Sequence, residues 1–307
     1  MSLFQSHAGF CITRNKFQLV EIDFDNEQFY LENVDEELFD DAFDSSVKEQ
    51  NLINILQTSF DKLSARKTLN CQHVSVALHH NFFKIVELPY DETLTRTDLN
   101  EHFNWELKQL FPSEISSNYF IQFIEVDKSN IRNDKSVLLI AADKRMLNIV
   151  HKFCLKNKMT MKIADNMHFA TNIFLPLDNR SVKNEVFLSL MINPNDISMM
   201  VIDEDKPVYF SVKHFTGQSE IIPLIEDGVH KLGRFDLSLD SITKCYLFGD
   251  NVSDDLTEQI NSQLSISLKK INPFDNIKVK PHIYENKFFI EQYNSFASAT
   301  GIALRLQ

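Results

Sequence analysis

The first 35 residues alternate between apolar and polar positions and are interrupted by short polar turns. Three strand-like runs, GFCITR, FQLVEIDF and QFYLENV, are separated by the turns at 14–16 and 25–27. A period of two is typical of strands, and short polar turns join antiparallel neighbours. From Val47 to Leu63 the apolar positions change to helical spacing. The pattern predicts a three-stranded meander covered on one face by a helix.

The stretch 73–163 predicts a second unit with the order strand, strand, helix, strand, strand, helix. Strand-like runs at 73–80 and 82–90 precede a helix whose apolar stripe ends near Pro112. Two further runs, at 119–126 and 136–143, precede a helix around 144–157. This order is typical of a compact α+β insert. The apolar stripe of the first of these helices consists of Leu99, Phe103, Leu107 and Leu110.

A second meander follows, and its pattern repeats that of the first. Its strand-like runs, EVFLSLMIN, ISMMVID and PVYFSVKHF, are broken at 193–196 and 204–206. Recurrence of a meander and helix at about 9–65 and 186–233 predicts a duplicated α/β unit with a cleft between two lobes. Further along we expect a strand at 245–250, a helix at 252–264, a strand at 266–271 and a helix near 286–300. The predicted boundaries are 1–72 plus 164–180 for the first lobe, 73–163 for the insert and 181–307 for the second lobe.

Charge and composition narrow the choice of partners. A formal net charge of -12 without a basic stripe disfavours nucleic acid. No apolar run reaches the 18 or so residues that a membrane span needs, and the four scattered cysteines and the N-terminus MSLFQSHAGF indicate neither disulfides nor a secretion signal. Only six glycines are present, which leaves little room for glycine-rich phosphate loops. We therefore expect a cytoplasmic chain that does not insert into a membrane.

Several phrases resemble, in order, those of the actin-like ATPase superfamily, most closely its type IV pilus assembly PilM family. FNWELKQLFP at 103–112 is similar to that family's V-x-W-E-x-E-x-x-I-P helix, and KIADNMHFATNIF at 162–174 to its V-D-x-x-x-F-A segment. The stretch 247–277 resembles its L-x-G-G-G-A, helix, L-x-I-x-V and NPF sequence, and ATGIALRLQ at 299–307 its closing G-L-A-L-R. The resemblance covers nearly the whole chain. It implies an α/β fold of two RNase H-like lobes with ATP between them, and an inserted subdomain that helps to bind the cytoplasmic tail of a membrane protein.

The first phosphate loop of that superfamily, G-L-D-I-G-S-S-S-x-K, falls on residues 9–18, and few of its functional residues are kept. Gly9 matches, and Gln18 stands at the final Lys. Cys11 stands where an Asp helps to hold hydrated Mg²⁺, and a thiol is a poor ligand for this hard cation. Thr13 stands at a Gly, and a β-branched residue does not easily take the φ > 0 conformations open to glycine. The resemblance implies a degenerate site.

The second phosphate loop and the adenosine loop are altered as well. The motif D-I-G falls on Met191, Ile192 and Asn193, so its acid is missing, and the paired glycines of the adenosine loop fall on Gly249 and Asp250. Asn193 and Asp250 tolerate the left-handed conformation, so the turns can persist with side chains that crowd the ligand.

The first turn carries two cations, Arg14 and Lys16. These side chains either bind an anion other than the nucleotide or belong to a solvated hairpin turn, and both readings stay open.

Other candidate sites have structural explanations. His79 and His80 are adjacent in a strand-like run and are expected to point to opposite faces, and His151 and Cys154 lack a third ligand, so we predict no metal site. Trp105 lies off the apolar stripe of its helix and either anchors a partner or packs partly against the sheet of the insert. The candidate partner-binding residues are Phe103, Trp105 and Phe111.

The sequence favours a catalytically inactive, actin-like pseudo-ATPase that binds no cofactor and acts as a cytoplasmic interaction module or scaffold. Its expected partner is a protein, such as a peptide segment of a membrane-associated assembly. One alternative is a PilM-like ATPase that binds ATP and Mg²⁺ through an altered site. Another is a structural subunit that forms homo-oligomers, as actin-like proteins can.

Overall fold

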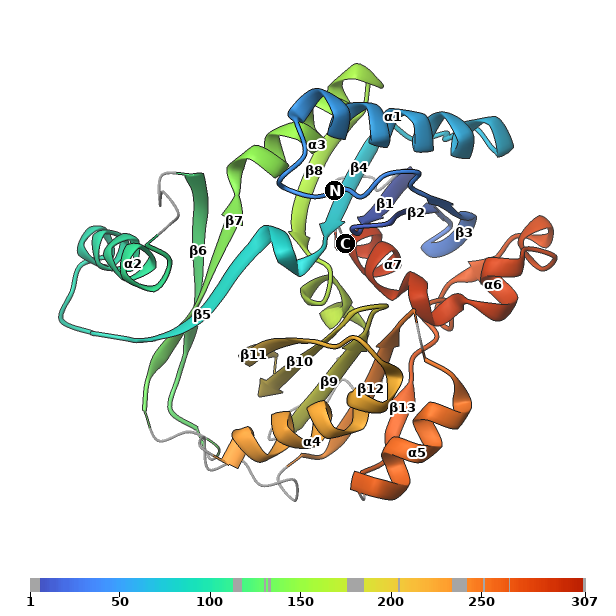
Figure 1. The fold of residues 1–307 in the computed structure, drawn as a ribbon. Coiled ribbons are helices and arrows are strands. Elements are labelled where there is room, and N and C mark those ends of the chain that lie inside the picture. Colours follow the sequence, from blue (N-terminus) through green and yellow to red (C-terminus); the bar gives the residue numbers. More distant parts are fainter. Residues whose placement is uncertain are drawn as a thin grey trace.

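Two larger sheets with the same strand order form the body of the molecule, and a smaller sheet projects from it (Figure 1). The computed structural model describes residues 6–112, 118–129, 131, 134–175, 185–203, 205–233, 242–250, 252–264 and 266–305. Among these residues, no helix combines the length and the apolar character that a membrane crossing requires.

The first sheet is a meander extended by parallel strands. The antiparallel strands β1, β2 and β3 form the meander, and β4 and β8 continue the sheet in parallel from β1. Its strands, in spatial order, are β14 (Lys278–Val279), β3 (Gln28–Leu38), β2 (Lys16–Asp25), β1 (Ser6–Ile12), β4 (His73–Leu78) and β8 (Thr160–Asn166).

Helices α1 (Glu49–Arg66) and α3 (Lys144–Lys156) cover one face of this sheet. Side chains of a strand alternate between faces, so Phe10 and Ile12 meet these helices while Cys11 lies on the opposite face. Phe17 links the layers, with ring centroids 4.9 Å from Phe10 and 5.9 Å from Phe153. Burying such a ring contributes about 1.5–3 kcal/mol, so this aromatic cluster fixes the helices on the sheet.

The second sheet repeats the order of the first. An antiparallel meander of β9, β10 and β11 is continued by the parallel strands β12 and β13. The duplication that the sequence predicted is therefore confirmed. The strands, in spatial order, are β11 (Lys206–His214), β10 (Asp196–Asp203), β9 (Val186–Ile192), β12 (Lys244–Gly249) and β13 (Leu268–Lys270), and the helices that follow β11 and β12 are α4 (Ile221–Leu232) and α5 (Asp254–Leu264).

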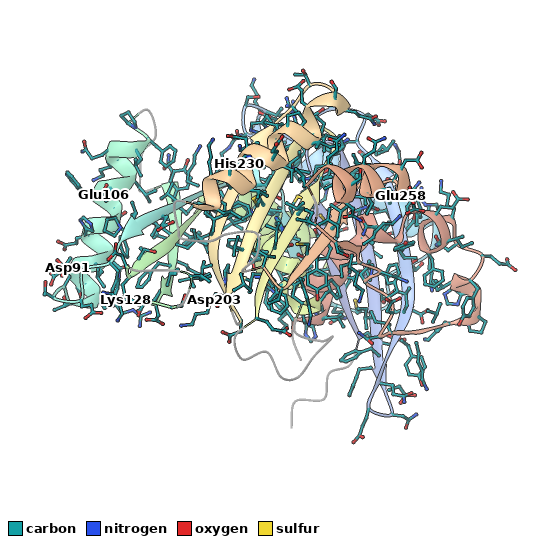
Figure 2. All side chains as sticks on the ribbon, turned by 90° about the horizontal axis from the view of Figure 1, so that it is seen from below. Asp91, Glu106, Lys128, Asp203, His230 and Glu258 are labelled. Atoms are coloured by element: carbon teal, nitrogen blue, oxygen red, sulfur yellow. The ribbon has the colours of Figure 1, made fainter. Side chains whose placement is uncertain are left out.

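The insert is a three-stranded sheet with one helix, placed in the connection between β4 and α3. Figure 2 shows it projecting from the body, with Asp91 and Glu106 labelled on it. Helix α2 begins at a capping box, in which Thr95 and Asp98 satisfy each other's backbone N–H groups, and packs on the sheet through Leu99, Phe103 and Leu107. The elements are β5 (Phe83–Pro89), α2 (Arg96–Leu110), β6 (Tyr119–Val126) and β7 (Ser136–Asp143), with the strand order β5-β7-β6.

This topology corrects the predicted bounds of the insert, 73–163. Strand β4 pairs with β1 and β8, and α3 packs on α1, so all three elements belong to the first lobe. The insert proper spans about 83–143. Five of the six side chains of β4 are buried, which a strand between two neighbours requires, but the pattern of one strand cannot say which sheet holds it.

The C-terminal segment returns to the first lobe, which corrects the prediction that 181–307 forms the second lobe alone. Helix α7 (Ala297–Leu304) is wholly buried and packs on β1 and on η3 (Phe169–Phe174). A Cβ atom on Gly9 would lie 1.9 Å from Ala299 O, and one on Gly301 2.1 Å from Ala170 O, so both contacts require glycine. The predicted boundary at 180–181 lies outside the described residues.

The single helix expected near 286–300 is divided into three short pieces. These are α6 (Lys287–Glu291), η8 (Tyr293–Phe296) and α7. Asn294, within η8, donates hydrogen bonds to Leu247 O at 3.0 Å and Ile271 O at 2.8 Å. These bonds tie the break in the helix to the second sheet. The remaining short helices are η1 (His80–Phe82), η4 (Gln218–Glu220) and η7 (Pro281–Ile283).

Candidate functional site

The two lobes present the same turn to the cleft between them. In the β1–β2 turn, Thr13 N–H donates to Lys16 O at 3.0 Å. In the β9–β10 turn, Asn193 N–H donates to Asp196 O at 2.9 Å. Lys16 and Asp196 are thus equivalent positions, each the first residue of the second strand of its meander.

A second pair of equivalent positions follows the strand next to each turn. After β4, His79 N–H donates to Ile12 O at 3.1 Å, and after β12, Asp250 N–H donates to Ile192 O at 2.9 Å. Both residues lie at the carboxyl end of a parallel strand, where ligand sites of α/β sheets are usually found. Each lobe therefore offers one turn residue and one strand-end residue to the cleft.

Lys16 joins the turn of the first lobe to the strand end of the second. Its Nζ lies 2.6 Å from Asp250 Oδ1 and 2.8 Å from Glu36 Oε2, and the three side chains are only 7%, 15% and 12% exposed. Burial opposes the charge of Lys16, but the two carboxylates outweigh it and raise the pKa of this ammonium group. Gln18 Nε2 donates to the same Glu36 oxygen at 2.8 Å and to Ser295 Oγ at 3.2 Å.

Asp196 joins the turn of the second lobe to the strand end of the first. Its Oδ2 lies 3.1 Å from His79 Nε2, its Oδ1 lies 2.8 Å from His80 Nε2, and Asn193 Nδ2 donates to Oδ1 at 2.8 Å. Burial alone would raise the pKa of Asp196, but hydrogen bonds from both histidines hold it well below the ordinary value. Burial lowers the pKa of His80. We call the Lys16 and Asp196 clusters the two crossed contacts.

The geometry of His79 and His80 was wrongly predicted. Strand β4 ends at Leu78, His79 caps the short helix η1, and His80 is its first residue. The alternation of a strand therefore no longer applies, and both rings turn toward Asp196, with centroids 4.4 Å apart. Sequence reasoning also missed Asp196, which lies five residues beyond Met191, the position where an acid was sought. Its place four residues after Ile192, matching Lys16 after Ile12, is the signal that the duplicated meander offered.

The residues aligned with the first phosphate loop have other surroundings. Gly9 lies within β1 beneath α7 and away from the turn. Cys11 is fully buried, and burial raises the pKa of its thiol to about 12, so it stays protonated. Thr13 Oγ1 donates to Asn15 Oδ1 at 2.9 Å, and the Arg14 side chain is 58% exposed beside Asp44 at 3.6 Å. The structure thus places Arg14 outside the cleft, whereas its neighbour Lys16 lies within it.

The residues aligned with the other two loops lie near the crossed contacts. The side chain of Met191 is buried in the core, and the side chain of Asn193 donates a hydrogen bond to Asp196. Gly249 has φ +123°, and a Cβ atom there would lie 2.0 Å from Ile192 O. The backbone of this position requires glycine, while the side chain of the next residue, Asp250, is directed to Lys16.

Asp250 lines two pockets. One, of about 820 Å³, lies between residues 218–223 and 252–263, and the other, beside the turns, is smaller and acidic. A pocket of about 310 Å³ is lined by the β1–β2 turn, by Pro194 and Gly249, and by the segment 291–295. Its charged side chains are Glu36, Asp250 and Glu291 against Lys16 and Lys270, and Lys270 is itself paired with Asp254 at 2.8 Å. Carboxylates therefore outnumber the cations that could face a phosphate.

The candidate partner-binding residues of the insert differ in exposure. Phe103 is fully buried and packs on Phe123 at 5.1 Å, because it lies on the sheet-facing stripe of α2, so it is excluded as a surface contact. Trp105 is 54% exposed, with its ring stacked near His102 at 6.1 Å. Phe111 is partly buried, and Lys84 Nζ lies 5.0 Å from its ring centroid.

A groove of about 760 Å³ lies along the outer edge of β6. It is bordered by the segment from Tyr90 to Asn100 at the start of α2, by Ile121–Glu125 of β6, and by Lys206 of the second lobe. Sequence reasoning did not single out this groove, because its apolar side chains come from two segments that are separated in the chain.

Comparison with known proteins identifies the fold. No family model and no curated protein sequence matches this chain. The chain is similar to a chain of the PilM–PilN type IV pilus biogenesis complex, with a TM-score of 0.72, 17% identity, and 97% of this chain and 98% of that chain covered. It is also similar to a Bacteroides thetaiotaomicron protein with an actin-like ATPase fold and unknown function, with a TM-score of 0.55, 11% identity and 98% of each chain covered.

A third similar structure is the cytoplasmic domain of EpsL from Vibrio cholerae, with a TM-score of 0.51, 7% identity and 90% of each chain covered. These identities are low, and the likeness is one of fold. Together with the duplicated sheets, it shows that the chain has the two-lobed, actin-like ATPase fold.

Proposed function

We propose that this chain is a catalytically inactive, actin-like pseudo-ATPase that acts in the cytoplasm as a scaffold for a peptide segment of a membrane-associated protein. The observation that carries the proposal is the pair of crossed contacts. At the turn of the first lobe Lys16 is paired with Asp250 of the second lobe, and at the turn of the second lobe Asp196 is paired with His80 of the first. The resemblance places the phosphates of ATP at these two turns.

The charges beside the cleft support the proposal that this chain does not bind nucleotide. A triphosphate needs cations or free backbone N–H groups, and the N–H groups of Thr13 and Asn193 are used within their own turns. The charge of Lys16 is already matched by Glu36 and Asp250. Bringing further negative charge to this buried acidic cluster costs Coulomb energy.

Magnesium binding has equally little support. Mg²⁺ selects oxygen ligands in octahedral geometry. At the position of the expected Asp the chain has the protonated thiol of Cys11, which points into the core. We therefore propose that no cofactor is needed.

The groove on the insert supports the choice of partner. Strand β6 is an edge of its sheet, and an edge strand can pair with an extended peptide while neighbouring pockets select its side chains. Tyr90, Leu94 and Ile121 supply apolar surface to the groove, and Trp105 is exposed further along α2, outside the groove lining. Two similar structures are a PilM–PilN complex and the cytoplasmic domain of an inner membrane component of a secretion system, which fits a membrane-associated partner.

Thermal unfolding with and without millimolar Mg-ATP tests the nucleotide half of the proposal. A ligand that binds only the folded state stabilises it by about 2.7 kcal/mol at 100 times its Kd. We expect no change in Tm beyond that caused by Mg²⁺ alone. A clear upward shift with ATP would contradict the proposal and favour an ATPase with an altered site.

Selection from a displayed library of extended peptides tests the partner half. Enriched peptides, labelled and titrated with the full chain, should lose affinity at least about tenfold when Trp105→Ala is introduced. Leu155→Ala is the matched control, because Leu155 is 59% exposed on α3, outside the insert. If the two variants lose the same affinity for the peptides, or if neither loses any, the binding surface lies elsewhere.

A further inference from the structure

Three side chains that can bind metal ions meet where the two lobes touch. The available ligand atoms of His79, His80 and Asp196 all lie within 4.8 Å of one another, and the three residues are 6%, 4% and 3% exposed. The histidines follow β4, at the start of η1, and Asp196 is the first residue of β10. The donors therefore combine two imidazole nitrogens with one carboxylate oxygen and come from both lobes.

We propose that His79, His80 and Asp196 bind a divalent transition-metal ion that joins the two lobes. Imidazole nitrogens with one carboxylate suit zinc, cobalt or iron, whereas magnesium and calcium take oxygen donors. The ion would be held by three protein ligands, which leaves one position for water.

The distances leave room for an ion with small side-chain movements. Zinc lies about 2.0–2.2 Å from such ligand atoms, so two ligands of a tetrahedral site are roughly 3.3 Å apart. In the structure His79 Nε2 is 3.1 Å and His80 Nε2 is 2.8 Å from the two oxygens of Asp196. These two His–Asp separations differ from that value by a few tenths of an ångström, and all three ligand atoms lie within 4.8 Å of one another, so the rings would have to turn toward a common point to bind the ion.

Coordination would move one proton within each ring. In the hydrogen-bonded form each Nε2–H donates to Asp196, and in the metal-bound form Nε2 coordinates the ion while Nδ1 carries the proton. His79 Nδ1 accepts a long bond from Asn81 N–H at 3.3 Å, which the metal-bound form gives up. Among the described residues, His80 Nδ1 has no hydrogen-bond partner, so its tautomer is not fixed by a neighbour.

The local charge favours a cation over an anion. Asp196 supplies a carboxylate, and Asn193 Nδ2 adds only a neutral donor at 2.8 Å. A carboxylate beside two imidazole rings in a buried site interacts with a positive ion more strongly than it would in water. The metal proposal does not depend on the proposed function, because a pseudo-ATPase and a working ATPase would both retain these ligands.

Titration with Co²⁺, followed by its visible absorption, tests the proposal directly. The full chain is first treated with a chelator and then titrated, and Zn²⁺ is added to displace the cobalt. We expect one Co²⁺ per chain with the absorption of nitrogen and oxygen ligands in low coordination number. Asp196→Asn and His80→Gln should each weaken binding more than about tenfold. His230→Gln should bind as the native chain does, because His230 is an exposed surface residue.

Three other outcomes would contradict the proposal. No cobalt absorption in the native chain would mean that the cluster is only a hydrogen-bonded contact between the lobes. Unchanged binding in Asp196→Asn and His80→Gln would place the ion elsewhere, and a sulfur-to-cobalt absorption band would place it at a cysteine. Circular dichroism of each variant shows whether it is folded, and the displacement by Zn²⁺ in the native chain provides a test that needs no variant.

Discussion

Gly9 lies where β1 passes beneath the buried helix α7. It matches the first glycine of a phosphate loop, yet a Cβ atom there would lie 1.9 Å from Ala299 O and 2.8 Å from Ala303 Cβ. Both neighbours belong to a helix whose every residue is buried, so neither can move away easily. At this residue, close packing accounts for the glycine without a nucleotide.

Gly9→Ala is expected to destabilise the protein by about 3 kcal/mol, since added core atoms force backbone shifts. Chemical denaturation monitored by circular dichroism measures the change in the free energy of unfolding. Gly233→Ala is the control, because a Cβ atom added there would have no atom of the described residues within 4 Å, and its φ is −58°. The control should be neutral or more stable by up to about 1 kcal/mol. Equal effects in the two variants would refute the packing role.

His7 predicts a pH dependence of stability. Burial, with smaller contributions from His73 and Lys162, lowers the pKa of His7 to about 4. The unfolded chain keeps a pKa near 6.5, so it takes up a proton first as the pH falls. The contribution to stability is therefore complete above about pH 6.5 and is lost progressively between pH 6.5 and 4, and it amounts to on the order of 3 kcal/mol.

Denaturation at pH 7.5 and at pH 5 checks this expectation in the native chain and in His7→Gln. The variant should lose less stability between the two values than the native chain does. His230→Gln should behave as the native chain, because its ring is 77% exposed. Identical losses in the native chain and His7→Gln would show that His7 does not contribute.

At the scale of elements, the sequence predicted most strands and the duplication, because buried runs such as VFLSLMI and short polar turns are local signals. It did not predict which sheet β4 joins or that α7 returns to the first lobe. Those contacts join residues distant in the chain, such as Gly9 with Ala299, and leave no periodic trace. The crossed contacts were missed for the same reason.

The first crossed contact is expected to stabilise the closed arrangement of the lobes through a buried charge. Lys16→Met leaves Glu36 and Asp250 close together without their cation, which should cost about 3 kcal/mol. Adding Asp250→Asn removes one of the unpaired charges. The double variant should therefore be more stable than the sum of the single effects predicts, by at least about 1 kcal/mol.

A double-mutant cycle of unfolding free energies measures this coupling. Lys152→Met is the matched control, because its partner Glu49 and Lys152 itself are largely exposed, and it should have little effect. Additive effects of Lys16→Met and Asp250→Asn would mean that the two residues do not interact across the cleft.

At the scale of the whole molecule, contacts in several separate parts of the structure hold the lobes together. The crossed contacts connect the turns and strand ends, Gln18 reaches Ser295, and α7 packs on the first lobe while its chain continues from the second. In hinged ATPases of two lobes, a ligand shifts the balance between open and closed states only if it binds them with different affinity. Because side chains of this chain already join the lobes at both turns, we expect ATP to bind the two states without such a difference.

Small-angle X-ray scattering of the native chain should therefore give the same radius of gyration with and without millimolar Mg-ATP. The double variant Asp196→Asn/Asp250→Asn removes the acid through which each crossed contact joins the lobes. It should have a larger radius of gyration, and its backbone amides at 13–16 and 193–196 should exchange hydrogen faster, because these turns lose their partners in the opposite lobe. Replacing two exposed acids, Glu258 and Asp91, by amides should change neither quantity. A radius that shrinks with ATP in the native chain would show that the lobes still close on nucleotide. An unchanged radius in the double variant would assign lobe closure to the contacts that remain, such as α7 and the bond from Gln18 to Ser295.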